Sequence, residues 1–297
     1  MKWRFRAISS ALILTAVVFP LKRLEALMIT PNPVPIRVAT SDLVIVGKVL
    51  GFADQLVPSK LTPTDNREMQ IARVEVSETV FGADQKEIRL GFFPARAFAP
   101  NGPRPPAGRV PGLQLMVGQE FLAFLTRHPI RKDVYVARMF TDVISKKDSP
   151  SFASDLELAK KSAKMLANSK SGLTSDDAKL SLTTAAMLVY RYRVPPGGNL
   201  EREILEDISA EESKLILEAI SRADWNLVRS NDRLNNPLLL FLYLGLTDKD
   251  GWTLPEDKAQ LKIQAKKWLQ ERKATYRIRR FVRNGENHPS AEPEKEK

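Results

Sequence analysis

The amino-acid sequence predicts an α+β, multidomain protein in which a five-stranded β-barrel, residues 36–145, precedes an all-α helical domain, residues 151–283. Two observations predict this division. Before residue 145 apolar residues alternate along short runs rich in valine and isoleucine, as they do in half-buried strands. After residue 151 they recur with the period of a helix, so that one face of each segment is apolar.

The composition limits the chemistry of the chain. Of its 297 residues 43% are hydrophobic and 27% are charged, as in globular proteins that bury a core. No cysteine is present, which excludes disulfides, thiolate metal sites and cysteine nucleophiles. The two histidines, His128 and His288, are too few for a zinc site built on several histidines. We therefore expect no metal and no cofactor.

Residues 1–26 have the pattern of a secretory signal peptide. A basic start precedes an apolar run from residue 7 to residue 21, and Ala26 is a small residue suited to cleavage after it. Lys22 and Arg23 directly follow the run and favour the alternative, an uncleaved N-terminal membrane anchor. We expect an extracytoplasmic protein, secreted or periplasmic. Its net charge of +11 falls to +7 without this segment, which suits acidic partners or simply solubility.

Five runs predict the strands of the barrel. Residues 27–35 hold three prolines and predict an extended linker before it. One buried and one wet face are indicated by residues 72–80, whereas Phe121–Leu125 is apolar on both faces, as in a central strand. The predicted strands are Leu43–Leu50, residues 72–80, residues 88–93, Phe121–Leu125 and Val134–Met139.

Two long loops interrupt these strands, Ala53–Glu68 and Pro94–Gly118. Loops of this length are expected to be either functional or mobile insertions. The second loop is rich in proline and arginine. Its cations, the candidates for partner binding, are Arg96, Arg104 and Arg109.

Three segments of the β-region carry a resemblance to a known family. They are Asp42–Val49, Val80-Phe81-Gly82 and Val117–Leu125. Over roughly residues 36–140 the chain resembles the netrin-like module, the OB-type barrel of the tissue inhibitors of metalloproteinases. The resemblance implies that fold. It does not imply protease inhibition, because those inhibitors chelate zinc through an N-terminal cysteine that is absent here. The two-part layout resembles exported bacterial proteins of unassigned function.

The C-terminal half predicts several helices that form a bundle or an irregular α-solenoid. Capping boxes at Thr174–Asp177 and at Ser209–Glu212 each indicate a helix start. Asn236-Pro237 starts an apolar helix, and Pro255 starts a last long helix that continues into the basic residues beyond it. Residues 284–297 are polar and predict a disordered tail.

The sequence contains none of the common catalytic motifs. G-x-S-x-G, H-E-x-x-H and G-x-x-x-x-G-K are all absent. His128 follows an apolar strand, a position that favours a structural role over a catalytic one. Asp248–Gly251 is better explained as a turn between helices than as a calcium loop, because Leu246 would stand at the first ligand position.

These observations favour an extracytoplasmic binding or interaction protein without a recognisable catalytic site. The alternatives are a hydrolase that acts on envelope polymers with two carboxylates, and a binder of anionic surfaces. The partner would be another envelope protein, an anionic polymer or an anionic surface, and export argues against nucleic acid. The candidate anion-binding residues, expected on the last helix, are Lys273, Arg277, Arg279, Arg280 and Arg283.

Overall fold

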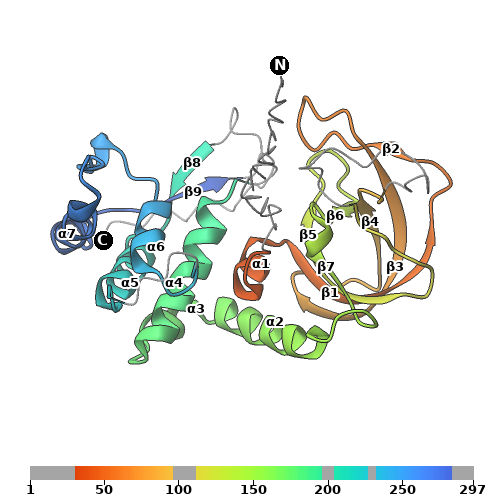
Figure 1. Ribbon diagram of the computed structural model, residues 1–297, viewed down its shortest axis with the longest axis horizontal. Helices are drawn as coiled ribbons and strands as arrows, with labels where there is room; N and C mark the ends of the chain where they lie inside the picture. The colour runs from red at the N-terminus through yellow and green to blue at the C-terminus, as the bar shows by residue number, and fades with distance from the viewer. Residues whose placement is uncertain (1–30, 96–111, 196–203, 227–231, 283–297) are drawn as a thin grey trace, which may run out of the picture.

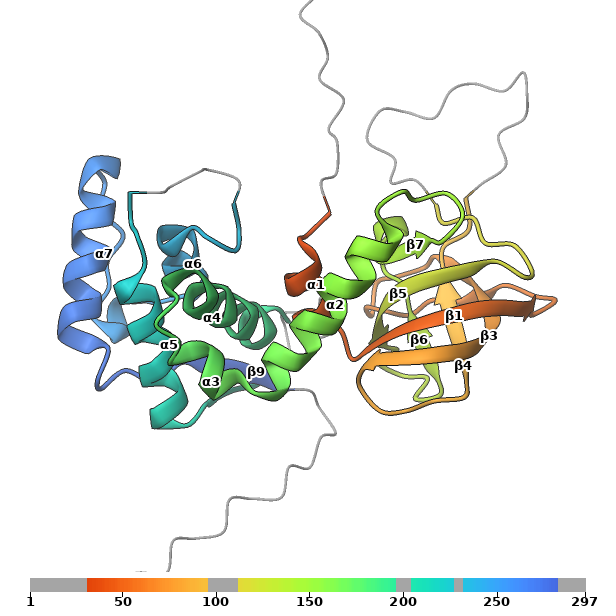
Figure 2. The same cartoon turned by 90° about the horizontal axis from the view of Figure 1, so that it is seen from below.

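The computed structural model describes residues 31–95, 112–195, 204–226 and 232–282. The expected signal peptide and the expected polar tail lie outside these residues. As predicted, the fold is mixed: the strands of the large sheet gather at one end of the molecule, and most helices lie at the other together with a two-stranded sheet, which corrects the expected all-α half (Figure 1). Helices α1 (Val34–Thr40) and α2 (Phe152–Ala167) lie between the two ends. Figure 2 shows the same order from below.

The hydrogen bonds of the large sheet form a circuit. β1 pairs antiparallel with both β3 and β5, β3 pairs with β4, β4 pairs parallel with β6, and β6 pairs with β5. Two short strands, β2 and β7, pair with β3 and β5 respectively. The strands are β1 Leu43–Phe52, β2 Val57–Pro58, β3 Glu68–Phe81, β4 Glu87–Phe92, β5 Glu120–Arg127, β6 Val134–Val136 and β7 Val143–Ser145.

The alternation along each strand assigns its residues to two faces, because successive side chains of a strand point to opposite sides. One face of the circuit is a closely packed apolar cluster to which Ile45, Val74 and Leu90 contribute. Phe121, Ala123 and Leu125 of β5 pack there as well. The alternation predicted for β1 and for residues 72–76 is therefore confirmed, whereas Val80, expected on the same face, packs in the cluster on the other side of the sheet, because the register between β1 and β3 shifts along the strands.

The other face of β5 is covered by helices, which explains why this strand is apolar on both sides. Leu122 and Phe124 pack with Val44 against residues of α1 and α2. The outer face of β3, β4 and β6 is covered differently. There Met69 and Val134 pack beneath residues of the segment 53–67. The sheet thus has apolar contacts on both of its sides.

Helix α1, Val34–Thr40, corrects the sequence prediction at the start of the fold. The expected linker 27–35 ends in the first turn of this helix, and residues 36–40, expected in the barrel region, continue it. Pro35 is compatible with a helix because the first backbone N–H groups have no partner within the helix. Ile36 packs in the helical core and Val38 packs against the sheet, so α1 joins the two halves.

The helices of the second half match the predicted segments. Asp177 caps α4, although the sequence favoured a start at Thr174, and Ser209 and Asn236 cap α5 and α6 as expected. The last helix starts three residues after Pro255, with Asp257 as its cap. The helices are α2 Phe152–Ala167, α3 Ser169–Leu173, α4 Ala178–Arg193, α5 Ala210–Arg222, α6 Pro237–Tyr243 and α7 Lys258–Arg272.

Aromatic side chains fill the centre of the helical half. Phe241 of α6 is fully buried, with its ring centroid 4.8 Å from that of Trp252 and 5.5 Å from that of Trp268. Both ring pairs meet edge to face, the arrangement that the charge distribution of aromatic rings favours.

The last helix is shorter than predicted and ends at Arg272. After it, Arg279–Val282 forms strand β9, which pairs with β8, Ile204–Asp207. Within the described residues, no helix has the length and apolar character needed to cross a bilayer.

Candidate functional site

The most deeply buried polar cluster of the β-region joins the segment 53–67 to the end of β5. Ser59 is fully buried, and its hydroxyl donates to a carboxylate oxygen of Asp65. Arg67 donates to the same carboxylate from Nε at 2.8 Å and lies over the ring of Phe93 at 4.0 Å. The hydrogen bond from Arg67 has the largest effect, and with the bond from Ser59 it holds the pKa of Asp65 far below its usual range. The carboxylate is therefore ionised throughout the physiological range.

His128 completes this cluster. Its Nε2 lies 2.6 Å from the carbonyl oxygen of Ser59. Its Nδ1 accepts the backbone N–H groups of Ile130 at 3.1 Å and Arg131 at 3.0 Å. The ring must therefore carry its proton on Nε2, which donates to Ser59. Burial is the main cause that lowers the pKa of His128 and keeps the ring neutral.

The geometry argues against a serine–histidine–aspartate catalytic site, although all three residue types meet here. A general base needs a free acceptor nitrogen directed at the hydroxyl that it deprotonates. The single lone pair of His128 Nδ1 is shared by two backbone donors, and its Nε2 faces the carbonyl of Ser59 rather than the hydroxyl. The histidine has the bonds of a structural residue, in keeping with the expectation from the sequence.

The candidate loop arginines Arg96, Arg104 and Arg109 lie outside the described residues, but both ends of their loop are described. Leu113 N–H donates to the Phe93 carbonyl at 2.8 Å, and Ala95 N–H donates to the Leu113 carbonyl at 3.1 Å. The two ends are therefore held together beside β4, and the loop starts and finishes at one point of the sheet.

Exposed apolar residues gather near this point. Met116 and Val117 are 55% and 65% exposed, and Leu50 and Phe52 at the end of β1 are each 37% exposed. Backbone bonds bring the two segments side by side, since Gly118 N–H donates to the Val49 carbonyl at 2.8 Å. We call Leu50, Phe52, Met116 and Val117 the apolar rim. Isolated exposed apolar residues are ordinary, whereas a group of them marks a candidate contact surface.

The candidate anion-binding residues do not form a basic helix, contrary to the prediction. Three of them are bonded within the fold. Arg277 donates twice to the Ile208 carbonyl, Arg279 pairs with Asp250 at 2.7 Å, and Arg280 pairs with Glu206 at 3.3 Å. Lys273 follows the last turn of α7, and Arg283 lies outside the described residues. The helix ends before these residues. Their side chains instead hold the segment 277–280 to β8, to the residue after it and to the turn before α7.

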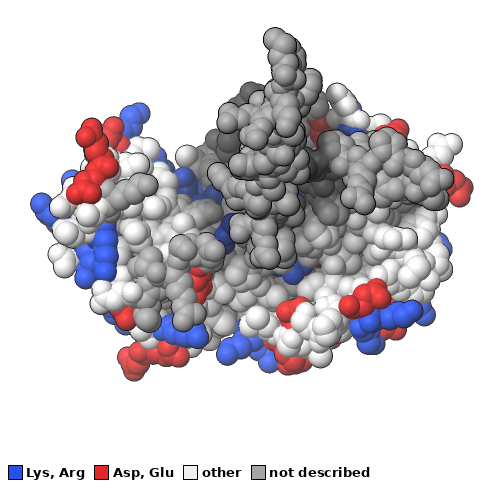
Figure 3. Space-filling view, viewed as in Figure 1, with Lys and Arg blue, Asp and Glu red and all other residues white. Residues whose placement is uncertain are grey.

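Exposed cations occur instead on α7 itself. Lys266, Lys267 and Arg272 are all exposed on this outermost helix, and Glu271 is the acid in their midst. The ion pair between Lys267 and Glu271 is long, at 4.0 Å. On the face shown in Figure 3, cations and anions are interspersed over both halves of the molecule rather than separated by sign.

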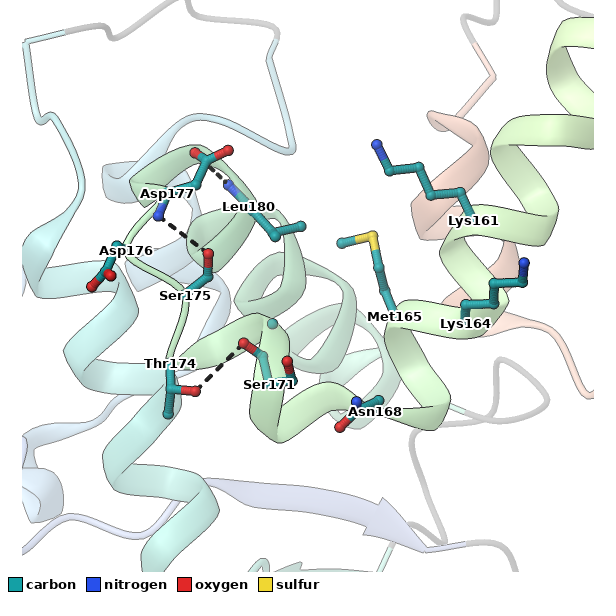
Figure 4. A pocket seen from close by; sticks show the side chains of 11 residues that line it. Lys161, Lys164, Met165, Asn168, Ser171, Thr174, Ser175, Asp176, Asp177 and Leu180 are labelled. Carbon is teal, nitrogen blue, oxygen red and sulfur yellow. Dashed lines mark hydrogen bonds between the residues drawn. The ribbon is translucent and has the colours of Figure 1, made fainter.

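A hollow of about 650 Å³ opens between α2 and the start of α4 (Figure 4). Lys161 and Lys164 come from α2, while Asp176 and Asp177 come from the segment before α4, across the hollow. Asp177 accepts the N–H groups of Lys179 and Leu180 and so already occupies the positive end of α4. The hollow is open to solvent, and none of its four charged residues is buried.

Sequence reasoning missed Arg37, a buried arginine of α1. Its guanidinium lies 3.9 Å from the centroid of the Phe124 ring and donates to the Thr141 carbonyl. Burial lowers its pKa to about 10, against the opposing effect of Asp142 and Asp155. A single arginine among the apolar residues 34–39 is the signal that could have identified it.

No protein-family model matches the chain, and no curated protein matches its sequence. In the described part of the chain no group of three histidine, cysteine, aspartate or glutamate side chains could hold a metal ion.

The segment considered as a calcium loop is a turn. Asp248–Asp250 forms a 3₁₀ turn in which Asp250 accepts the N–H of Thr247, and Gly251 ends the turn in a left-handed conformation. This is the helix-connecting turn that the sequence favoured.

Proposed function

We propose that the chain is an extracytoplasmic binding protein whose β-region is an OB-type barrel of the netrin-like kind. The closed order of the strands, with its parallel contact between β4 and β6, supports the barrel. Export is supported by the sequence pattern of residues 1–26. The helical half supports the barrel through α1 and α2, and the partner is another envelope protein.

The observation that carries this proposal is the apolar rim. Its four exposed apolar residues come from the end of β1 and from the segment before β5, next to the fixed ends of the arginine-rich loop. Added Cβ atoms at Gly51 and Gly118 would meet nothing within 4 Å, so the chain on both sides of the rim borders open space. An exposed group of apolar side chains is typical of the centre of a protein-binding surface.

The test compares two surfaces of equal exposure in the full-length chain. Met116→Ser/Val117→Ser removes the most exposed half of the rim, and Leu254→Ser/Ile263→Ser removes residues of 65% and 60% exposure at the helical end. We expect the rim variant to lose partners captured from an envelope fraction and the second variant to retain them. Retention by the rim variant would contradict the proposal. The isolated barrel is unsuitable, because Leu122 and Phe124 would lose their cover.

Binding to an anionic surface is the second candidate function, and the exposed cations of α7 are the observation that favours it. Each lysine near an anionic membrane contributes about 1 kcal/mol, and the contribution is screened by salt. We expect vesicles of phosphatidylglycerol to bind the protein at low salt and to release it at high salt. Lys266→Gln/Lys267→Gln should weaken binding, whereas Lys86→Gln/Lys147→Gln, exposed lysines of the β-region, should not.

A further inference from the structure

The segment 53–67, which we call the strap, crosses the outer face of β3, β4 and β6. We propose that the strap is releasable, and that protonation of His128 at acid pH releases it and uncovers the apolar face beneath. This inference concerns a different part of the β-region from the apolar rim and does not depend on the proposed function.

The strap covers side chains that would otherwise be an exposed apolar surface. Met69, Ile71, Val134 and Val136 are all at most 2% exposed, and strap residues pack over them. The packing strap residues are Val57 and Leu61. The first part of the strap bonds to β3 through backbone groups: Ala53 N–H donates to the Ile71 carbonyl, and Val57–Pro58 forms the short strand β2.

The middle of the strap, residues 59–67, is the loop of the hairpin that joins β2 to β3, and its Ser59 N–H donates to the Arg67 carbonyl. Ser59 is held from the strap side by Asp65 and Arg67, and from the sheet side by His128. The histidine in turn fixes the turn after β5, because Nδ1 accepts two successive backbone N–H groups. One imidazole therefore joins the strap to the turn between β5 and β6.

Protonation is incompatible with this arrangement. A second proton on His128 would sit on Nδ1, which faces the N–H groups of Ile130 and Arg131. The new N–H on Nδ1 would then face two backbone N–H groups, so that donors meet donors. Protonation would also create a charge on a residue that is only 2% exposed. The ring can take up the proton only if it leaves this site, and Ser59 is released when it does.

The surrounding charges leave His128 as the group that titrates. On the strap side Asp65 stays ionised, because Arg67 holds its pKa far below the usual range. On the sheet side Arg131 opposes protonation and Asp133 favours it, while Asp133 is itself paired with Arg89 of β4. Burial outweighs these effects and lowers the pKa of the closed histidine. The closed strap is therefore fully stable above the ordinary histidine pKa of about 6.5, and it loses stability as the pH falls from there to the lowered pKa of His128.

The experiment uses the absence of cysteine from the chain. Met69→Cys places a single thiol beneath the strap, and Ala153→Cys places one on the exposed start of α2. Both are labelled in the full-length protein with a pyridyl disulfide, a reagent that reacts with thiols at acid pH. The labelling rate at residue 69 divided by that at residue 153 removes the intrinsic effect of pH. We expect this ratio to rise by up to about tenfold per unit as the pH falls below about 6.5.

Two controls separate release of the strap from unfolding. Ala123→Cys lies inside the sheet circuit and should stay unlabelled over the same range, since only the outer cover moves. The fluorescence of Trp225, Trp252 and Trp268, which all lie in the helical core, should stay constant. Labelling of residue 123 in parallel with residue 69 would overturn the proposal, as would a flat ratio at residue 69.

His128→Asn tests the group itself. An asparagine oxygen can accept the same two N–H groups but takes up no proton in this range, so the ratio at residue 69 should no longer depend on pH. A persistent rise would overturn the role of His128. If this variant does not fold, His288→Gln leaves His128 as the sole histidine, and NMR follows its ring protons. The ring should titrate where the labelling ratio levels off, and a ring that titrates near 6.5 would contradict the mechanism.

Discussion

Replacing Arg37 by methionine removes the buried cation that joins α1 to the sheet. The guanidinium donates to the Thr141 carbonyl and stacks on Phe124 at 3.9 Å. A hydrogen bond from a charged group contributes about 1.5–3 kcal/mol and a desolvated cation–π contact about 0.5–2 kcal/mol, while methionine restores part of the apolar packing. We expect the free energy of unfolding at pH 7 to fall by roughly 2–4 kcal/mol.

Asp142 gives this prediction a pH dependence. Burial already raises the pKa of Asp142, and Arg37 opposes that rise. Without Arg37 the pKa rises further above its unfolded value, so the ionised carboxylate destabilises the fold at neutral pH. The penalty disappears as the pH falls through the raised value toward the unfolded pKa of about 3.9. The loss of stability should therefore be smaller at pH 4 than at pH 7.

Urea unfolding at the two pH values measures both effects. Arg191→Met is the matched control, because this exposed arginine lies 5.4 Å from the centroid of the Phe81 ring. An exposed stack contributes about 0.5–1 kcal/mol, so the control should lose at most that much, with no difference between pH 4 and pH 7. A loss of less than about 1 kcal/mol for Arg37→Met at pH 7, or an equal loss at both pH values, would refute the reasoning.

Three further substitutions test other parts of the fold by thermal or urea unfolding. Phe241→Ala should cost about 3–5 kcal/mol, because the ring is fully buried between two tryptophans; a cost below about 1 kcal/mol would contradict the core. Gly82→Ala should cost about 1–3 kcal/mol, since its φ is 99° and an added Cβ would lie 2.5 Å from the Asp42 carbonyl oxygen. Gly51→Ala, in open space, is its control and should be near neutral. Asp177→Ala removes the cap of α4 and should cost about 1 kcal/mol; an unchanged midpoint would reject that cap.

Local periodicity predicted the main strands and helices because it depends on neighbouring residues alone. Leu43–Leu50 became β1, and Phe121–Leu125 became the centre of β5, with its two apolar faces. Ser209 and Asn236 were identified as helix starts because capping is also local.

Features that depend on distant partners could not be predicted. Three prolines around residue 33 indicate extended chain, and only the burial of Ile36 and Val38 between the two halves stabilises a helix there. Arg279–Val282 became a strand because β8, more than 70 residues away, pairs with it. The bond between His128 and Ser59 spans 69 residues, and that between Arg37 and Thr141 spans 104. A polar loop and a lone arginine carry no local sign of such partners.

Closure of the sheet through β1 and β5 is the feature on which the proposed barrel and its binding surface depend. NMR of deuterated, amide-protonated protein measures it directly through cross-strand contacts between backbone groups. We expect contacts that follow the pairs Ile45–Ala123 and Gly47–Phe121, together with slow amide exchange on both strands. Rapid exchange along the facing edges of β1 and β5, without such contacts, would show an open sheet and contradict the account.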